Sequence, residues 1–315
     1  MSGFAFAIHD GQARELPMKD APSTTADLVW AHLTDSNEHV QKWLRDEAKL
    51  PDYAIDALTA AETRPRCDAM QDAAFVNLRG LSSEATVSEP LASVRIYATE
   101  GRVYSVTRRP LNALEVVRKS VARGCVHDPG DLIAEFAAAI TEGLDPVVAD
   151  LGDSLDECET MLDATKAFEL RRTVTRARTE AIGYRRFLFP QRAALDKLAA
   201  LPGEWLREDD RQHLAAAADR AARMAEEVEA IRERAAVMHE TLTDLRAELL
   251  DQRSLVISIA AMVFLPLTFL TGLLGMNVEG IPYAQEPWAF WGVVGVSVVI
   301  GASVTGYFIW KNWTR

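Results

Sequence analysis

The chain has 315 residues, of which 49% are hydrophobic and 25% charged, and its mean hydropathy is close to zero. Its net charge of −12 argues against nucleic acid as a partner, because an acidic surface repels phosphates and attracts cations. Three scattered cysteines, Cys67, Cys125 and Cys158, argue against a disulfide framework.

The first part of the chain, residues 1–128, has the pattern of a small cytoplasmic α/β domain. Short segments rich in β-branched and aromatic residues predict strands, and helical periodicity lies between and after them. The predicted strands are Phe4–Ile8, Leu28–Leu33, Phe75–Leu78, Leu91–Ala98 and Arg102–Thr107. The predicted helices are His39–Leu50, Tyr53–Glu62 and Leu111–Arg123.

Residues 129–205 lose the strand signal and predict long antiparallel helices. Asp131–Ala164, which Pro146 should bend, forms the first. Lys166–Ala200 forms the second, with an interruption at Pro190, and Leu201–Trp205 predicts a turn.

A single long stalk helix is predicted over residues 206–274. Between Leu206 and Thr271 Pro266 is the one residue that is proline or glycine, so an unbroken helix would be on the order of 100 Å long. An apolar stripe at spacings of three and four predicts packing against the preceding helices or another copy of the chain. The stripe comprises Val228, Ile231, Ala235, Met238, Leu242, Leu245 and Leu249.

Two uncharged stretches near the C-terminus are long enough to cross a bilayer. Leu255–Leu274 has 20 residues and Trp288–Trp310 has 23, and a span needs about 20. Basic residues flank the pair at Arg246, Arg253, Lys311 and Arg315, whereas the connecting loop 275–287 has none. The positive-inside rule therefore places both termini in the cytoplasm, with 288–310 as the second span and 311–315 as a basic tail. No signal peptide is expected, since no basic residue precedes an apolar core at the N-terminus.

One face of the first span is small and weakly polar. At about 3.5 residues per step it comprises Ser254, Ile257, Ala261, Leu265, Thr268 and Gly272. Small residues allow close helix packing, so this face either packs against another helix or lines a pore. A pore requires several copies, because two spans cannot enclose a water-filled path. Pro266 frees the carbonyl of Met262, which Thr268 or water could satisfy.

The first span ends in Gly275, Met276 and Asn277. Asn277 could simply cap the helix. Repeated around an axis, its amide oxygen and nearby backbone carbonyls would instead form a ring of neutral ligands, which suits a cation that keeps much of its water.

These motifs resemble the CorA superfamily of divalent metal-ion transporters, and within it the ZntB-type zinc transporters, over essentially the whole chain. The residues that carry the resemblance are Met262–Asn277 with its Gly-Met-Asn, Glu62–Arg66, Phe189–Arg192, Ala261–Leu273 and Gly275–Pro282. The resemblance implies an α+β membrane protein that assembles as a homopentameric, CorA-like funnel. In that funnel the first span lines the pore and the second faces lipid.

The resemblance also implies the roles of individual residues. Gly275, Met276 and Asn277 would form the selectivity filter, and the small face from Ser254 to Gly272 would line the pore. Glu279, Asp251 and Glu240 would attract cations toward the pore and along the stalk. Leu274 and Val278 stand where magnesium-type members usually have Tyr and Phe, which favours the zinc branch. Glu279 stands where zinc-type members typically have glycine, which favours magnesium.

The predicted function is divalent-cation transport across the inner membrane. The favoured form is zinc uptake, which could be coupled to the proton gradient. The alternatives are a CorA-type magnesium or cobalt channel and, less favoured, a membrane-anchored scaffold that conducts nothing. Neither span contains an acid, a base or a histidine, so a side-chain proton relay is not expected. No nucleophile–base arrangement or catalytic cofactor motif is present, so an enzyme is not predicted. Weak zinc-ligand candidates are Cys125, His127, Asp128 and His239.

Overall fold

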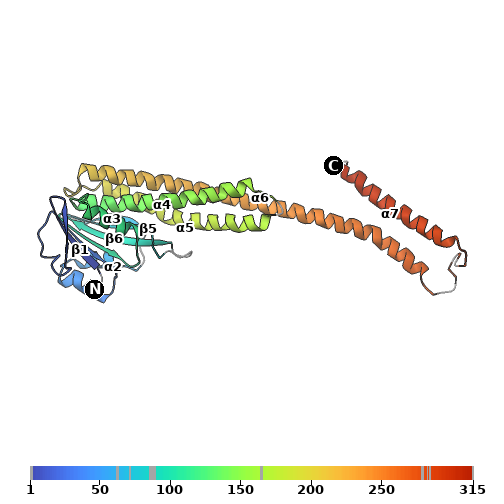
Figure 1. Ribbon diagram of the computed structural model, residues 1–315, viewed down its shortest axis with the longest axis horizontal. Coiled ribbons are helices and arrows are strands. Elements are labelled where there is room, and N and C mark those ends of the chain that lie inside the picture. The colour runs from blue at the N-terminus through green and yellow to red at the C-terminus, as the bar shows by residue number, and fades with distance from the viewer. Residues whose placement is uncertain are drawn as a thin grey trace. The chain divides into compact units, whose positions relative to one another are not determined.

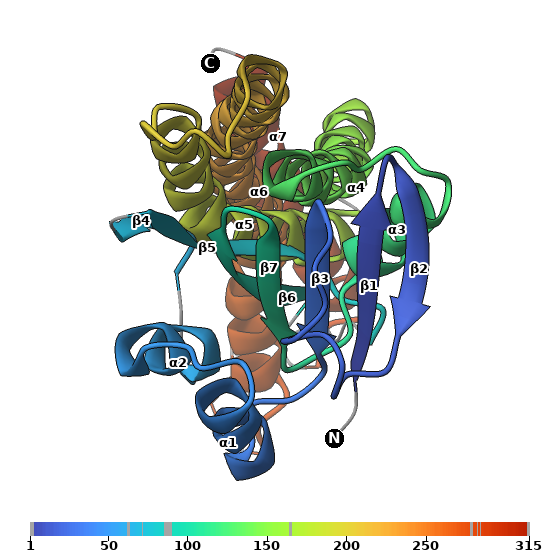
Figure 2. The same cartoon turned by 90° about the vertical axis from the view of Figure 1, so that its left-hand side faces the viewer.

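A computed structural model describes residues 3–61, 64–70, 72–84, 90–163, 166–277, 280–281, 283 and 285–313. The chain divides into two compact units, whose elements are labelled in Figure 1 and Figure 2. Unit 1 comprises residues 1–161 and 170–239, and unit 2 comprises residues 162–169 and 240–315.

Unit 1 is built on a seven-stranded sheet of order β2-β1-β3-β7-β6-β5-β4, in which β3 and β7 pair in parallel and all other neighbours antiparallel. The strands are β1 (Gly3–His9), β2 (Gln12–Leu16), β3 (Leu28–Leu33), β4 (Arg66–Met70), β5 (Ala73–Leu81), β6 (Leu91–Thr99) and β7 (Arg102–Thr107). The five predicted strands are confirmed. The prediction missed β2 and β4, the two edge strands, whose sequences QAREL and RCDAM contain no β-branched or aromatic residue.

Helices cover both faces of this sheet, because successive strand residues point to opposite sides. Val29 and Ala31 pack in one core with residues of α1 (Glu38–Asp46) and α2 (Asp52–Thr59). Trp30, between them, turns to the other side, where its ring lies 5.7 Å from that of Phe136. Figure 2 shows α3 (Asn112–Ala122) and α4 apart from α1 and α2. The predicted helix to Glu62 ends earlier, at Thr59, because Ala60 adopts an extended ψ of 142°.

Two long helices, α4 (Pro129–Thr160) and α5 (Ala167–Ala199), follow the sheet. Helix α4 begins two residues before the predicted start, because Asp128 caps it and Pro129 suits its first turn. The interruption predicted at Pro190 is wrong: α5 continues through it. A proline costs a helix about 3 kcal/mol, and the buried side chains of Leu188, Ala194 and Leu195 offset this loss by packing on both sides of it.

The predicted stalk and second span are also helices. Helix α6 runs from Glu208 to Leu274 without a break, and α7 runs from Ala289 to Trp313. The apolar stripe of α6 is buried from Val228 to Leu242, and its last members, Leu245 and Leu249, are half-buried. The predicted packing stripe is therefore confirmed over most of its length.

Replacing Phe136 by alanine should destabilise unit 1 by about 3–5 kcal/mol, because the ring is fully buried where α4 meets β3. Urea unfolding of the purified full-length chain measures the loss. The matched control is Val116→Ala on α3, where the side chain is 49% exposed and little change is expected. Equal losses in the two variants would contradict this account of the core.

Candidate functional site

The small face of α6 is continuous over nearly the whole first span. At about 100° per residue, Ser254, Ile257, Ala261, Leu265, Thr268 and Gly272 lie within an arc of roughly 80°. All six lie in one unbroken helix, so the arc forms one continuous stripe along the helix. Such a stripe can face a single axis along its whole length.

A single chain leaves this stripe open. All six residues are exposed, Ile257 at 69% and Leu265 at 72%. A Cβ atom built on Gly272 would have no atom of the described chain within 4 Å. Ala261 and Leu265 line a shallow apolar groove together with Val304 of α7. Helix α7 therefore approaches the middle of the stripe but does not cover Gly272.

The threonine hydroxyls of the span bond to their own helix. Thr268 Oγ1 donates to the carbonyl of Phe264 at 2.8 Å, and Thr271 Oγ1 donates to that of Leu267 at 3.0 Å. The suggestion that Thr268 satisfies the Met262 carbonyl is wrong, because a threonine in a helix reaches the carbonyl four residues before it. Hydroxyls bonded in this way carry no unpaired donor, so the helix tolerates them within an apolar span.

The Gly-Met-Asn segment begins where α6 ends. Gly275 donates its N–H to the carbonyl of Thr271 at 2.8 Å, and a Cβ atom there would lie 3.0 Å from the same oxygen. Glycine therefore lets the chain leave the helix in a tight turn. Met276 and Asn277 follow as exposed, non-helical residues. Glu279, the predicted cation-attracting residue of this loop, lies outside the described residues.

Helix α7 has the aromatic ends of a membrane span. Trp288 and Trp291 stand at its start, and Tyr307 and Trp310 lie near its end, all more than half exposed. Trp291 and Trp310 are separated by roughly 30 Å at about 1.5 Å per residue, which matches the hydrocarbon core of a bilayer. Tryptophan and tyrosine favour the two membrane–water interfaces. Helices α6 and α7 both contain stretches long and apolar enough to cross a membrane.

The remaining predicted residues lie on unit 1 and on the stalk. Asp251 and Glu240 are exposed on α6, and His239 is half-buried. Cys125 is exposed, and His127 Nδ1 lies 3.2 Å from a carboxylate oxygen of Asp131.

Among the described residues, Asp128 joins two carboxylates that the sequence did not single out, Asp131 and Asp210, and their ligand atoms lie within 4.8 Å of one another. The weak zinc candidates Cys125, His127 and His239 are not members of this group. The acidic residues at Asp131 and Asp210 also fit helix caps, so their pattern alone gave no reason to group them.

One motif residue of the family resemblance has a structural role. Gln191, from the segment Phe189–Arg192, is buried on α5, and its Oε1 accepts the backbone N–H of Arg79 at 2.8 Å. It thereby ties α5 to strand β5.

Comparison with known proteins places the chain among cation transporters. The sequence profile of the family described as "CorA-like Mg2+ transporter protein" matches residues 25–310. The protein named divalent cation transporter CmaX, from Pseudomonas aeruginosa, is 33% identical over 84% of this chain and 80% of its own length. The zinc transport protein ZntB of Pectobacterium carotovorum is 28% identical over 98% and 96%. The solved structure of full-length CmaX superposes with a TM-score of 0.77 at 29% identity, and covers 97% of each chain.

Proposed function

Because the chain belongs to the CorA-like family of Mg2+ transporter proteins, it is a divalent-cation transporter, and we propose that it takes up zinc across the inner membrane. The observation that carries the proposal is the stripe of small residues along α6, which a single chain leaves exposed and which ends in Gly275-Met276-Asn277. In the assembled transporter this stripe lines the path of the ion.

The path requires a homo-oligomer, which we propose to be a pentamer. One chain contributes two spans, and two helices in lipid cannot surround a column of water. Symmetric copies that turn the stripe to a common axis would cover it and leave α7 against the lipid. The exposure of Ile257, Leu265 and Gly272 in the single chain supports this arrangement. Both termini would then lie in the cytoplasm.

Zinc is favoured as cargo by the relative named a zinc transport protein, which aligns with 98% of this chain. Neither span contains an acid, a base or a histidine, so the spans offer no side-chain proton relay. Coupling to the proton gradient, which we include in the proposal, therefore has to run through water in the pore or through groups outside the spans.

Magnesium or cobalt is the second candidate, because of the chemistry of the predicted filter. The Asn277 amide and backbone carbonyls are hard oxygen ligands, and the thioether of Met276 is only a weak ligand. Such a ring binds Mg2+ through its water shell and provides no ligand that prefers zinc. Selectivity for zinc would then have to come from outside the filter.

Uptake by the purified protein in liposomes decides between the two candidates. Zn2+, Mg2+ and Co2+ are supplied separately, each with and without an inward proton gradient, and uptake is followed with ion-specific dyes. We expect zinc uptake well above that of empty liposomes, and faster with the gradient. Mg2+ uptake without zinc uptake would favour the second candidate, and no uptake of any ion would leave the non-conducting scaffold.

A further inference from the structure

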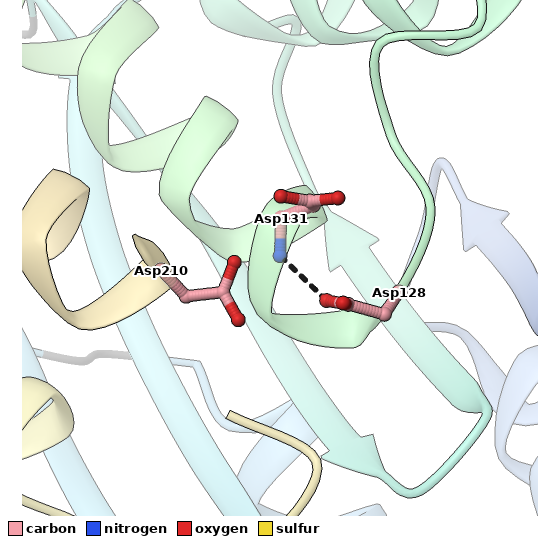
Figure 3. Close-up of side chains that lie close together, drawn as sticks. All are labelled: Asp128, Asp131 and Asp210. Atoms are coloured by element: carbon pink, nitrogen blue, oxygen red, sulfur yellow. Dashed lines mark hydrogen bonds between the residues drawn. The ribbon is translucent and has the colours of Figure 1, made fainter. Parts of the chain in front are cut away.

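Three aspartates meet where the first turns of α4 and α6 come together in unit 1. Asp128 is the N-cap of α4 and Asp131 lies in its first turn, whereas Asp210 belongs to the first turn of α6. One oxygen of each lies within 4.8 Å of the others. Figure 3 shows the carboxylate of Asp210 directed toward the other two.

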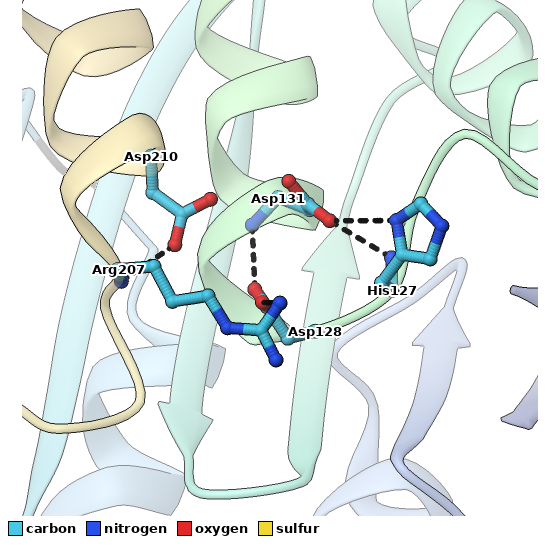
Figure 4. Close-up of polar contacts among 5 residues, drawn as sticks. All are labelled: His127, Asp128, Asp131, Arg207 and Asp210. Carbon is cyan, nitrogen blue, oxygen red and sulfur yellow. Dashed lines mark hydrogen bonds and ion pairs between the residues drawn. The ribbon is translucent and has the colours of Figure 1, made fainter. Parts of the chain in front are cut away.

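Each carboxylate uses one oxygen to cap a helix. Asp128 Oδ1 accepts the N–H of Asp131 at 3.0 Å, and Asp131 Oδ2 accepts the N–H of His127 at 2.9 Å (Figure 4). Asp210 Oδ2 accepts the N–H of Arg207 at 2.7 Å. Capping explains why acidic residues stand at these three positions. It does not account for the second oxygens of Asp131 and Asp210, nor for the close approach of the three carboxylates.

The second oxygen of Asp210 is buried without a partner. The residue is 0% exposed, and its Oδ1 accepts no hydrogen bond from any described residue. A buried and unpaired carboxylate oxygen is costly. The close approach is built into the chain: a Cβ atom on Gly130 would lie 2.1 Å from Asp210 Oδ2, so only glycine allows Asp210 to come this near α4.

Two basic side chains reach the cluster: Arg207, and His127, whose Nδ1 lies 3.2 Å from Asp131 Oδ2. Arg207 places Nη1 3.1 Å from Asp128 Oδ2, but its side chain is 63% exposed and makes this single ion pair within the cluster. Burial raises the pKa of Asp210 to about 7, and the charges of Asp128 and Asp131 act in the same direction. When all three are ionised, the carboxylates outnumber the Arg207 guanidinium and the neighbouring His127 imidazole, and the buried Oδ1 of Asp210 has no donor among the described residues.

We propose that Asp128, Asp131 and Asp210 bind a hard divalent cation of the Mg2+ or Mn2+ kind, which fastens the first turn of α6 to that of α4. The donor atoms are all carboxylate oxygens, the ligands that such cations prefer, and water completes the coordination. Zinc fits less well, because no sulfur or imidazole nitrogen belongs to the group. The site belongs to unit 1, whereas the spans belong to unit 2, and the proposal does not depend on the identity of the transported ion.

The test uses a nitroxide on Cys125, the exposed cysteine of the three, in the full-length protein. Cys125 lies three residues from Asp128, so Mn2+ bound at the cluster should broaden the nitroxide spectrum. We expect saturable broadening in the wild-type protein. Asp210→Asn should weaken Mn2+ binding at least about tenfold, because the amide keeps the cap on Arg207 and removes the charged ligand.

The matched control is Asp209→Asn, which removes the same charge from the same turn of α6 at an exposed position and should leave the broadening unchanged.

A second variant and a second measurement keep the test decisive should Asp210→Asn fail to assemble. The variant is Asp128→Asn, whose amide still caps α4. Mg2+ in place of EDTA should raise the thermal unfolding midpoint more in the wild-type and Asp209→Asn proteins than in the Asp210→Asn protein. Absence of broadening in the wild-type protein would overturn the proposal in favour of a proton shared by Asp210 and Asp131. Equal weakening by Asp209→Asn would overturn it in favour of a diffuse acidic surface.

Discussion

Replacing Asn277 by alanine is expected to abolish divalent-cation uptake in liposomes while the oligomer remains intact. Asn277 is exposed and lies past the last turn of α6, so its side chain is not part of a buried core among the described residues. In the proposed pore each copy offers one amide oxygen to the same hydrated ion. Each amide ligand contributes about 1 kcal/mol to the binding free energy of the ion. Summed over several copies, its removal corresponds to far more than a tenfold loss in the affinity of the filter for the ion.

Uptake and assembly have to be measured together, by ion-specific dye in liposomes and by light scattering of the detergent-solubilised protein. The matched control is Asn112→Ala, which removes an exposed amide from the start of α3 and should leave both readings unchanged. Normal uptake by the Asn277→Ala protein would contradict the filter and favour Asn277 as a simple helix cap. Loss of the oligomer would show that Asn277 acts in assembly.

The sequence was most informative where a pattern lies within one continuous stretch of chain. The length of α6 follows from a run in which Pro266 is the one helix breaker, and the two spans follow from uncharged stretches. The buried stripe from Val228 to Leu242 follows from apolar residues at spacings of three and four, and none of these patterns needs knowledge of distant contacts. The motif Gly275-Met276-Asn277 supplied the family through its resemblance to known transporters, and the comparisons confirm that family.

The features that the sequence did not predict depend on tertiary contacts. The edge strand β4 is recognisable only beside β5, which supplies its hydrogen bonds. Helix α5 continues through Pro190 because packing outweighs local propensity. Asp210 follows Asp131 by 79 positions, and the two meet only because α6 returns to the start of α4. From the sequence, a carboxylate can be recognised as the cap of its own helix. The same pattern does not indicate that a second helix lies beside it.

Gly272→Val is expected to reduce ion uptake at least about tenfold without destabilising the chain. A Cβ atom at this position meets no atom of the described chain within 4 Å, and valine suits a helix better than glycine does. A single copy therefore accommodates the larger side chain. The expected loss comes from the assembled pore, where every copy would add three carbons to the same narrow ring.

The matched control is Gly306→Val on α7, which likewise meets no atom of the described chain within 4 Å and, in the proposed arrangement, faces lipid. Uptake should stay near the wild-type rate in this variant. Uptake in liposomes and the oligomeric state are measured on the same variants. Together they decide whether the small stripe packs helices or lines a pore. A stripe that only packs helices would make Gly272→Val dissociate the copies, because small residues at such contacts let helices approach closely. A stripe that lines water would leave the copies assembled and the path closed.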